Sequence, residues 1–123
     1  MKIPEKVVKQ CKEKLLEAKM DILNRFRDAR NTLMNSDDSR GGDEADQTMR
    51  IIAEGEYLSQ QERLRERLAE IEAALARIES GHFGLCEETE EQIEVERLLA
   101  IPWTRLSIEG AEIREAVNKR YAR

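Results

Sequence analysis

The sequence predicts a mainly α fold: a long antiparallel coiled-coil hairpin over residues 1–80, followed by a small globular lobe and a C-terminal helix over residues 81–123. Two observations lead to this prediction. Apolar residues recur every three or four positions through two long segments, which is the pattern of an amphipathic helix. A polar segment rich in Asp, Ser and Gly separates the two stripes, and such a composition is typical of a reversing turn.

The first stripe predicts one helix over residues 5–33. Its apolar positions are Val8, Cys11, Leu15, Ala18, Ile22, Phe26, Ala29 and Leu33. Pro4 stands where a first-turn proline is tolerated. The tip loop over residues 35–46 contains the pair Gly41-Gly42 and should end this helix and reverse the chain.

The second stripe predicts a helix from about residue 44 to residue 80. Its apolar positions are Ala45, Met49, Ile52, Ala53, Tyr57, Leu64, Leu68, Ile71, Leu75 and Ile78, and the last five alternate four and three residues apart, as in a coiled coil. Gln61 interrupts this apolar seam, and Ser80-Gly81 is a C-terminal stop. Two such helices joined by a short loop should pack antiparallel, and a closed hairpin makes a monomer the simplest case.

Composition excludes several classes of function. The net charge of −5 argues against nonspecific binding to nucleic acid, which needs a cationic surface, and against an anionic membrane surface. No apolar run approaches the roughly 20 residues that span a bilayer, and the first residues lack the apolar core of a signal peptide. We therefore expect a cytoplasmic protein in which Cys11 and Cys86 are free thiols, with a disulfide between them as the alternative.

The sequence contains no recognisable catalytic constellation, so we expect no enzyme activity and no cofactor. His82 is the only histidine and reads as a surface turn residue. Cys86 lacks a recognisable base that would make it a nucleophile. A metal site built from His82, Cys86, Glu87 and Glu88 matches no standard spacing.

The spacing of the lobe is that of a zinc finger that has lost its ligands. A four-cysteine finger needs two Cys-x-x-Cys pairs separated by roughly 15–20 residues. Residues 86–89 here read Cys-Glu-Glu-Thr, and residues 107–110 read Ser-Ile-Glu-Gly. Ser107 is instead a plausible N-cap for a helix over residues 107–122, although Gly110 occupies the position where Glu would complete a capping box.

The tip loop is acidic, and its carboxylates allow two interpretations. The acidic residues are Asp37, Asp38, Asp43, Glu44 and Asp46. Asp43 or Asp46 could simply cap the second helix and interact favourably with its dipole. Alternatively, carboxylates at the end of a long hairpin could deliver negative charge into a deep site, next to a bound Mg²⁺ or a basic side chain.

A resemblance to a known family is carried by residues 74–115, which read ALARIESGHFGLCEETEEQIEVERLLAIPWTRLSIEGAEIRE. This run resembles the C-terminal half of the DksA/TraR family of bacterial transcription regulators, with which it shares Phe83, Gly84, Cys86, Ile93, Arg97, Leu98, Ala100, Pro102, Leu106, Ile113, Arg114 and Glu115. The family's tip motif, Asp-x-x-Asp-x-Ala, falls on residues 43–48 at the family's distance from Cys86, with both aspartates present and Thr48 in place of the alanine. The resemblance covers roughly residues 35–115.

The resemblance implies a hairpin that enters the secondary channel of RNA polymerase, without direct DNA binding. It implies that Asp43 and Asp46 lie near the catalytic centre of the polymerase, with Thr48 where the family has Ala. Arg63 and Arg97 are basic where the family is basic, and are candidate polymerase contacts.

Two departures from the family change what is expected. The family's zinc ligands correspond to Cys86, Thr89, Ser107 and Gly110, and one thiolate cannot hold a structural zinc. We therefore expect a zinc-free lobe with a core of Phe83, Leu85, Ile93, Leu98, Leu99, Trp103, Leu106 and Ile108. The family's basic positions toward the alarmone ppGpp carry Glu70, Ile101 and Ala111 here, so ppGpp dependence should be weak or absent.

The sequence thus predicts a non-catalytic regulator of bacterial transcription that binds RNA polymerase through the secondary channel and modulates initiation. Two alternatives remain. One is a structural or adaptor coiled coil whose tip is only a helix cap. The other is stimulation of transcript cleavage, as in the Gre factors, in which tip carboxylates help to hold a second Mg²⁺.

Overall fold

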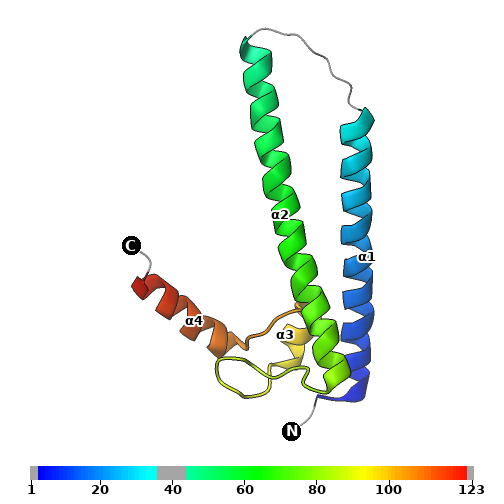
Figure 1. Ribbon diagram of the computed structural model, residues 1–123. Helices are drawn as coiled ribbons and strands as arrows, with labels where there is room; N and C mark the ends of the chain where they lie inside the picture. The colour runs from blue at the N-terminus through cyan, green and yellow to red at the C-terminus, as the bar shows by residue number, and fades with distance from the viewer. Residues whose placement is uncertain (1–2, 36–43, 122–123) are drawn as a thin grey trace. The chain divides into compact units, whose positions relative to one another are not determined.

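The computed structural model describes residues 3–35 and 44–121, and it confirms the mainly α class. Its helices are α1 (Glu5–Asn35), α2 (Glu44–Ser80), α3 (Val95–Ala100) and α4 (Ile108–Tyr121), and the long α1 and α2 form the predicted hairpin (Figure 1). Within these ranges there is no strand, and only one isolated antiparallel bridge, between Leu85 and Gln92. None of the described helices combines the length and apolarity that crossing a bilayer requires.

The molecule divides into two compact units, one of residues 19–69 and one of residues 1–18 with 70–123. The first comprises the tip-side parts of α1 and α2. The second comprises the lobe and the parts of both long helices that pack against it. The sequence predicted a different division, into a hairpin of residues 1–80 and a lobe of residues 81–123. The compact units are not separated at residue 80, and the predicted division stays a prediction.

The predicted apolar stripes supply most of the buried residues of the two long helices. Of the stripe residues, Cys11, Leu15, Ile22 and Ile71 are buried, and the described parts of the two helices also bury Gln61 and Ala74, which lie outside the stripes. One part of the prediction is wrong: Ala45, Met49, Ile52 and Ala53 are exposed. At 100° per residue, the apolar side chains of this end, which include Ile51 and Leu58, point to several sides of α2, so they cannot all face α1.

The lobe has a core in which α1 takes part, a contribution the sequence did not reveal. Its buried members are Cys11, Cys86, Ile93 and Leu98, and Ile3, Val7, Phe83, Leu99 and Leu106 pack against them. The Cys11 thiol donates to the carbonyl of Leu98 at 3.5 Å, and Lys14 Nζ donates to the carbonyl of Leu99 at 2.7 Å. The start of α1 is therefore attached to α3.

Three residues predicted in this core are not among its members: Trp103, which is half-buried, and Leu85 and Ile108, which are exposed. Leu85 is 50% exposed because it stands between the buried Gly84 and Cys86 in an extended segment, where successive side chains point to opposite sides. Ile108 is also 50% exposed, because the buried positions of the α4 N-terminus are Ser107 and Gly110, and Ile108 lies about 100° away from the first of these around the helix.

The helix ends agree with the local sequence. At the end of α2 the N–H of His82 donates to the carbonyl of Arg77 at 2.9 Å and that of Gly81 to Ile78 at 3.3 Å, a Schellman motif with Gly81 at φ 80°. Ser107 caps α4 as predicted, since its Oγ accepts from the N–H of Gly110 at 3.0 Å.

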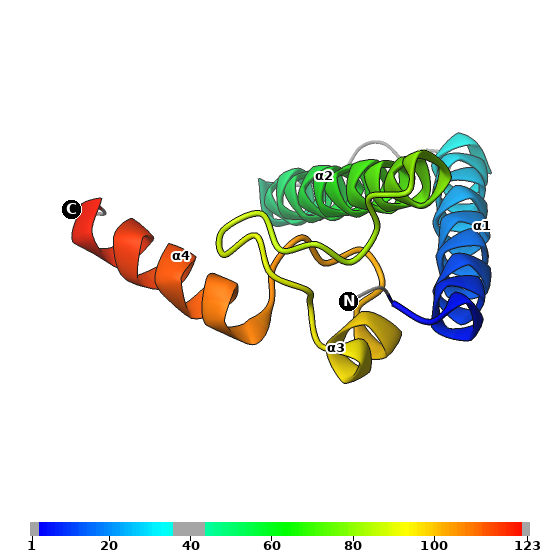
Figure 2. The same cartoon turned by 90° about the horizontal axis from the view of Figure 1, so that it is seen from below.

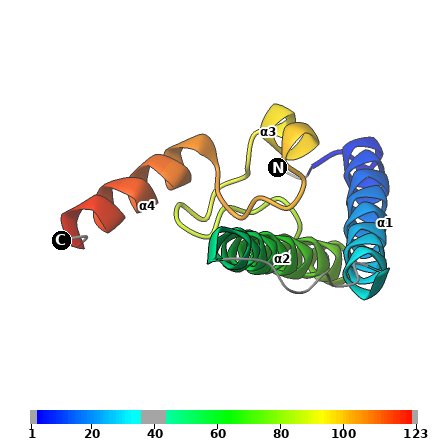
Figure 3. The same cartoon turned by 90° about the horizontal axis from the view of Figure 1, so that it is seen from above.

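Views from below and above agree that α4 leads away from α3 (Figures 2 and 3).

Candidate functional site

The acidic tip lies at the start of α2. Asp46 and Thr48 are exposed in its first turns, and Glu44 and Asp46 are the acidic residues of the first turn. Carboxylates at this position interact favourably with the helix dipole. Asp43 lies outside the described residues. The structure therefore places two of the three predicted tip residues on the surface, and the roles assigned to all three stay predictions.

The lobe brings together all four positions at which a zinc finger would have its ligands. Cys86 Sγ accepts the Ser107 hydroxyl at 3.4 Å and the Thr89 backbone N–H at 3.5 Å. The N–H of Gly110 donates in turn to Ser107 Oγ at 3.0 Å. One buried sulfur is thus the centre of a hydrogen-bonded cluster, which we call the Cys86 cluster and define as Cys86, Thr89, Ser107 and Gly110.

The Cys86 cluster does not fit a zinc ion. It offers one thiol, two hydroxyl groups and a glycine, whereas a structural site needs four ligands. A Cβ atom at Gly110 would overlap Cys86 Sγ and lie 3.3 Å from Ser107 Oγ, so these positions are packed against one another without room for a metal between them. Among the described residues, no group of three or more His, Cys, Asp and Glu side chains could hold a metal ion.

The environment of Cys86 favours its thiolate. Burial of the thiol raises its pKa, but hydrogen bonds from Ser107 and Thr89 outweigh burial and lower the pKa of Cys86 from 9.0 to about 6. Cys11 behaves in the opposite way: burial raises its pKa, although Lys14 acts against the increase. Both cysteines are free thiols, so the predicted alternative of a disulfide is not found.

Ion pairs tie α4 and the segment before it to the loop that carries Cys86. Arg114 Nη2 lies 2.9 Å from Glu88 Oε2, and Arg105 Nη1 lies 3.0 Å from Glu87 Oε1. These side chains are 30–42% exposed, so each pair contributes little to stability on its own. Arg114, one of the residues on which the family resemblance rests, is also 3.7 Å from Glu87, so both carboxylates of the loop orient its side chain.

The two predicted basic contacts have different surroundings. Arg63 is exposed on α2. Arg97 is half-buried, and its Nε donates to the carbonyl of Leu106 at 2.8 Å, so this side chain holds α3 to the segment that precedes α4. Sequence reasoning found the basic residue but not this internal bond.

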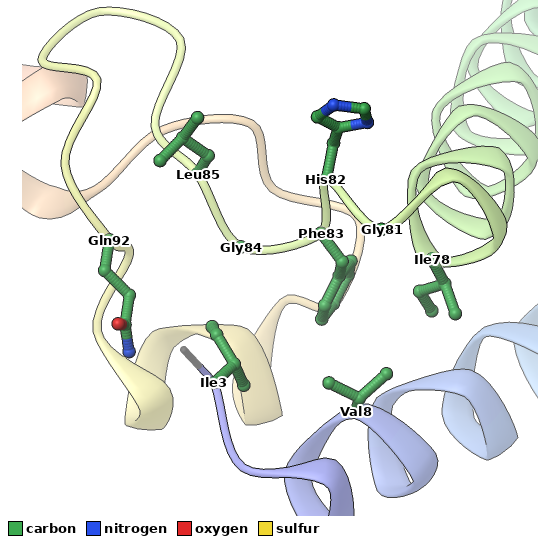
Figure 4. A pocket seen from close by; sticks show the side chains of 9 residues that line it. All are labelled: Ile3, Val8, Ile78, Gly81, His82, Phe83, Gly84, Leu85 and Gln92. Carbon is green, nitrogen blue, oxygen red and sulfur yellow. The ribbon is translucent and has the colours of Figure 1, made fainter. Parts of the chain in front are cut away.

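A hollow of about 370 Å³ lies beside the lobe core (Figure 4). Ile3, Val8, Ile78 and Phe83 point into it, whereas His82 points away on the other side of the backbone and lies 3.0 Å from Ser80 Oγ. Gln92 Oε1, at the edge of the hollow, is buried without a hydrogen-bond partner in the described part of the chain. Ile3, which precedes the predicted helix, gave no sign in the sequence that it lines this hollow.

Comparisons with known proteins place these features in a family. A family model described as the prokaryotic dksA/traR C4-type zinc finger matches residues 81–116, which include the Cys86 cluster. The RNA polymerase-binding transcription factor DksA of Caulobacter vibrioides is 35% identical over 104 residues, covering 85% of this chain and 72% of the relative. An uncharacterized protein of Aquifex aeolicus is 35% identical over 115 residues, covering 88% of this chain and 76% of the relative.

The fold is also similar to a solved structure. Transcription factor DksA2 from Pseudomonas aeruginosa matches with a TM-score of 0.78 and 31% sequence identity, and the match covers 95% of this chain and 88% of that chain. The similarity therefore includes both long helices as well as the lobe, and it confirms the resemblance that the sequence predicted.

Proposed function

The chain belongs to the DksA/TraR family, and we propose on that basis that it binds bacterial RNA polymerase and regulates transcription. The observation that carries this proposal is the similarity to an RNA polymerase-binding transcription factor over 85% of the chain, together with a shared fold over 95% of it. The protein acts in the bacterial cytoplasm as a monomer, without enzymatic activity and without binding DNA directly.

The hairpin is the part that we propose to enter the secondary channel of the polymerase. The lengths of α1 and α2, at 31 and 37 residues, and the exposure of Asp46 and Thr48 support this proposal. Asp43 and Asp46 are the effector residues, and modulate initiation by bringing negative charge to the catalytic centre. Thr48 adds a hydroxyl and a branched Cβ next to them.

The lobe is a positioning element that keeps its shape without zinc. Two observations support a lobe that folds without zinc. The side chains of the Cys86 cluster are too few to supply four metal ligands, and the lobe core includes residues of α1. Arg63 contacts the polymerase directly, and Arg97 acts at the lobe surface while its Nε holds Leu106.

Regulation by ppGpp is weak or absent in this proposal. Glu70, Ile101 and Ala111, all half-buried, stand at positions where the family is basic. A carboxylate facing a highly phosphorylated nucleotide is repulsive. The effect of the protein on transcription should therefore change little when ppGpp is added, in an assay in which a ppGpp-responsive relative changes clearly.

The proposal is tested by binding to purified core RNA polymerase and by transcription from a set of promoters. The variant Asp43→Asn with Asp46→Asn removes both tip charges, and Glu54→Gln with Glu56→Gln removes the same charge from exposed positions further along α2. We expect both variants to bind the polymerase, and only the tip variant to lose the effect on transcription.

The same experiment separates the alternatives. An adaptor coiled coil would show no binding to polymerase and would tolerate both pairs of substitutions. A cleavage factor would release short RNA fragments from stalled complexes in a Mg²⁺-dependent way, and would lose this activity in the tip variant. Absence of binding to the polymerase overturns the proposal.

A further inference from the structure

A groove of about 520 Å³ lies between α1 and α2 within the unit of residues 19–69. We call it the arginine groove. Its lining consists of Leu23, Phe26, Arg27, Arg30, Tyr57, Gln61 and Arg65. None of these residues belongs to the tip or to the Cys86 cluster, so the groove is separate from the features on which the proposed function rests.

The register of the two helices gathers these side chains. Arg27 and Arg30 are three residues apart on α1, and Tyr57, Gln61 and Arg65 follow one another at intervals of four on α2. Residues three or four apart lie on the same side of a helix. The groove is therefore formed by one face of each helix.

The charge of the groove is unbalanced. Three guanidinium groups line it and no carboxylate does, in a chain whose net charge is −5. In the part of the chain that the structure describes, no ion pair or hydrogen bond engages Arg27, Arg30 or Arg65, whereas the nearby Arg25 lies 3.1 Å from Asp21. Gathered like charges repel one another, and a bound anion would convert this cost into attraction.

Gln61 is the second observation that points to a ligand. It is only 7% exposed and stands in the apolar seam where the heptad pattern calls for a hydrophobic residue. Its amide is not enclosed, because in the described part of the chain the buried side-chain polar atom without a partner is Gln92 Oε1 and not an atom of Gln61. The amide therefore reaches the groove that Gln61 lines, and a ligand there can form hydrogen bonds with it.

We propose that the arginine groove binds a small ligand carrying two or more linked phosphate groups, such as inorganic triphosphate or a nucleoside triphosphate. Guanidinium groups form paired hydrogen bonds to phosphate oxygens, and the Gln61 amide can donate another. The half-buried rings of Phe26 and Tyr57 offer an apolar surface to a base. The volume falls in the range of roughly 300–1,000 Å³ that is typical of small-molecule sites.

Isothermal titration calorimetry on the full-length protein, in magnesium-free buffer, tests the proposal with inorganic triphosphate and with ATP. We expect saturable one-to-one binding. The variant Arg27→Gln with Arg65→Gln should weaken it by about tenfold or more, since charge-assisted hydrogen bonds are lost. The control Arg25→Gln also removes a positive charge from α1, but outside the groove, and should leave the affinity within about twofold.

The Gln61→Leu variant distinguishes a ligand site from a structural role. Leucine suits the apolar seam, so this variant should raise the melting temperature and yet weaken triphosphate binding. Equal affinities for triphosphate and ATP support a site that recognises phosphate alone, and a higher affinity for ATP supports contact with the base.

Three results would overturn the proposal. One is no saturable binding of either probe, and another is an equal loss of affinity in Arg25→Gln. The third is loss of polymerase binding in the double variant while neither probe binds, which would make the groove a protein contact. Because the calorimetry uses the isolated protein, failure of this proposal leaves the proposed function unaffected.

Discussion

Cys86 gives the lobe a dependence on pH. Its folded-state pKa of about 6 lies below the ordinary value of 9.0, so between these values the folded protein binds fewer protons than the unfolded chain. Stability should therefore rise from pH 6 to pH 9, and the contribution of the thiolate should disappear as the pH falls through 6. Thermal unfolding across this range measures the slope, and Cys86→Ala should have a clearly shallower one. Parallel slopes in the two proteins would contradict a stabilised thiolate.

Gly110 should be intolerant of any side chain. A methyl group there would overlap Cys86 Sγ and lie 3.3 Å from Glu88 Cβ, so Gly110→Ala should cost about 1–3 kcal/mol, as overpacked positions do. Gly55 is the matched control, because it lies inside α2 with nothing within 4 Å of an added Cβ. Gly55→Ala should stabilise the protein by roughly 0.5–1 kcal/mol. Denaturant unfolding of both variants tests the pair, and similar changes in both would argue against close packing at Cys86.

At the level of elements, α4 depends on a cap that is shared with the Cys86 cluster. Ser107 Oγ accepts from the N–H of Gly110 and donates to Cys86 Sγ. Ser107→Ala should therefore destabilise the protein by about 1 kcal/mol through loss of the cap and also raise the pKa of Cys86. Chemical denaturation at one pH measures the loss of the cap, and the pH dependence of the unfolding free energy measures the change in the pKa of Cys86. Ser59→Ala, at an exposed position of α2, should change neither.

The elements also show which structural information is local. Helix periods, the Gly81 stop and the Ser107 cap depend on neighbouring residues, and the sequence predicted all of them. The six-residue α3 was missed, because a helix of that length has too few positions for a periodic pattern. The exposure of Leu85 and Ile108 was missed because it depends on which side of the chain Cys86 and Ser107 occupy. The arginine groove requires the register between two helices, and Gln61 was recognised only as an interruption of the seam.

For the whole molecule, the chain order hides a shared core. Residues 1–18 form one compact unit with residues 70–123, so Ile3 and Val7 stabilise a lobe that begins only after residue 80. Gly84 marks this contact: its φ is 90°, and a Cβ there would lie 2.8 Å from Ile3 Cγ1. A lobe without zinc needs an alternative source of stability, and part of it comes from the start of α1.

The last prediction concerns metal independence of the whole protein. Structural zinc contributes about 10–16 kcal/mol to the folding of small fingers, so a chelator unfolds them. Here the Cys86 cluster and the α1 contacts stabilise the lobe in place of a metal. An excess of EDTA should therefore leave the melting temperature and the helical circular dichroism unchanged.

The triple variant Thr89→Cys, Ser107→Cys and Gly110→Cys is the positive control. Without metal it should be destabilised, because the new side chain at Gly110 overlaps Cys86 Sγ, and zinc should restore its stability in a chelator-sensitive way. A fall in the melting temperature of the unaltered protein in EDTA would contradict the prediction, since its stability would then depend on a metal that its single cluster thiol cannot hold alone.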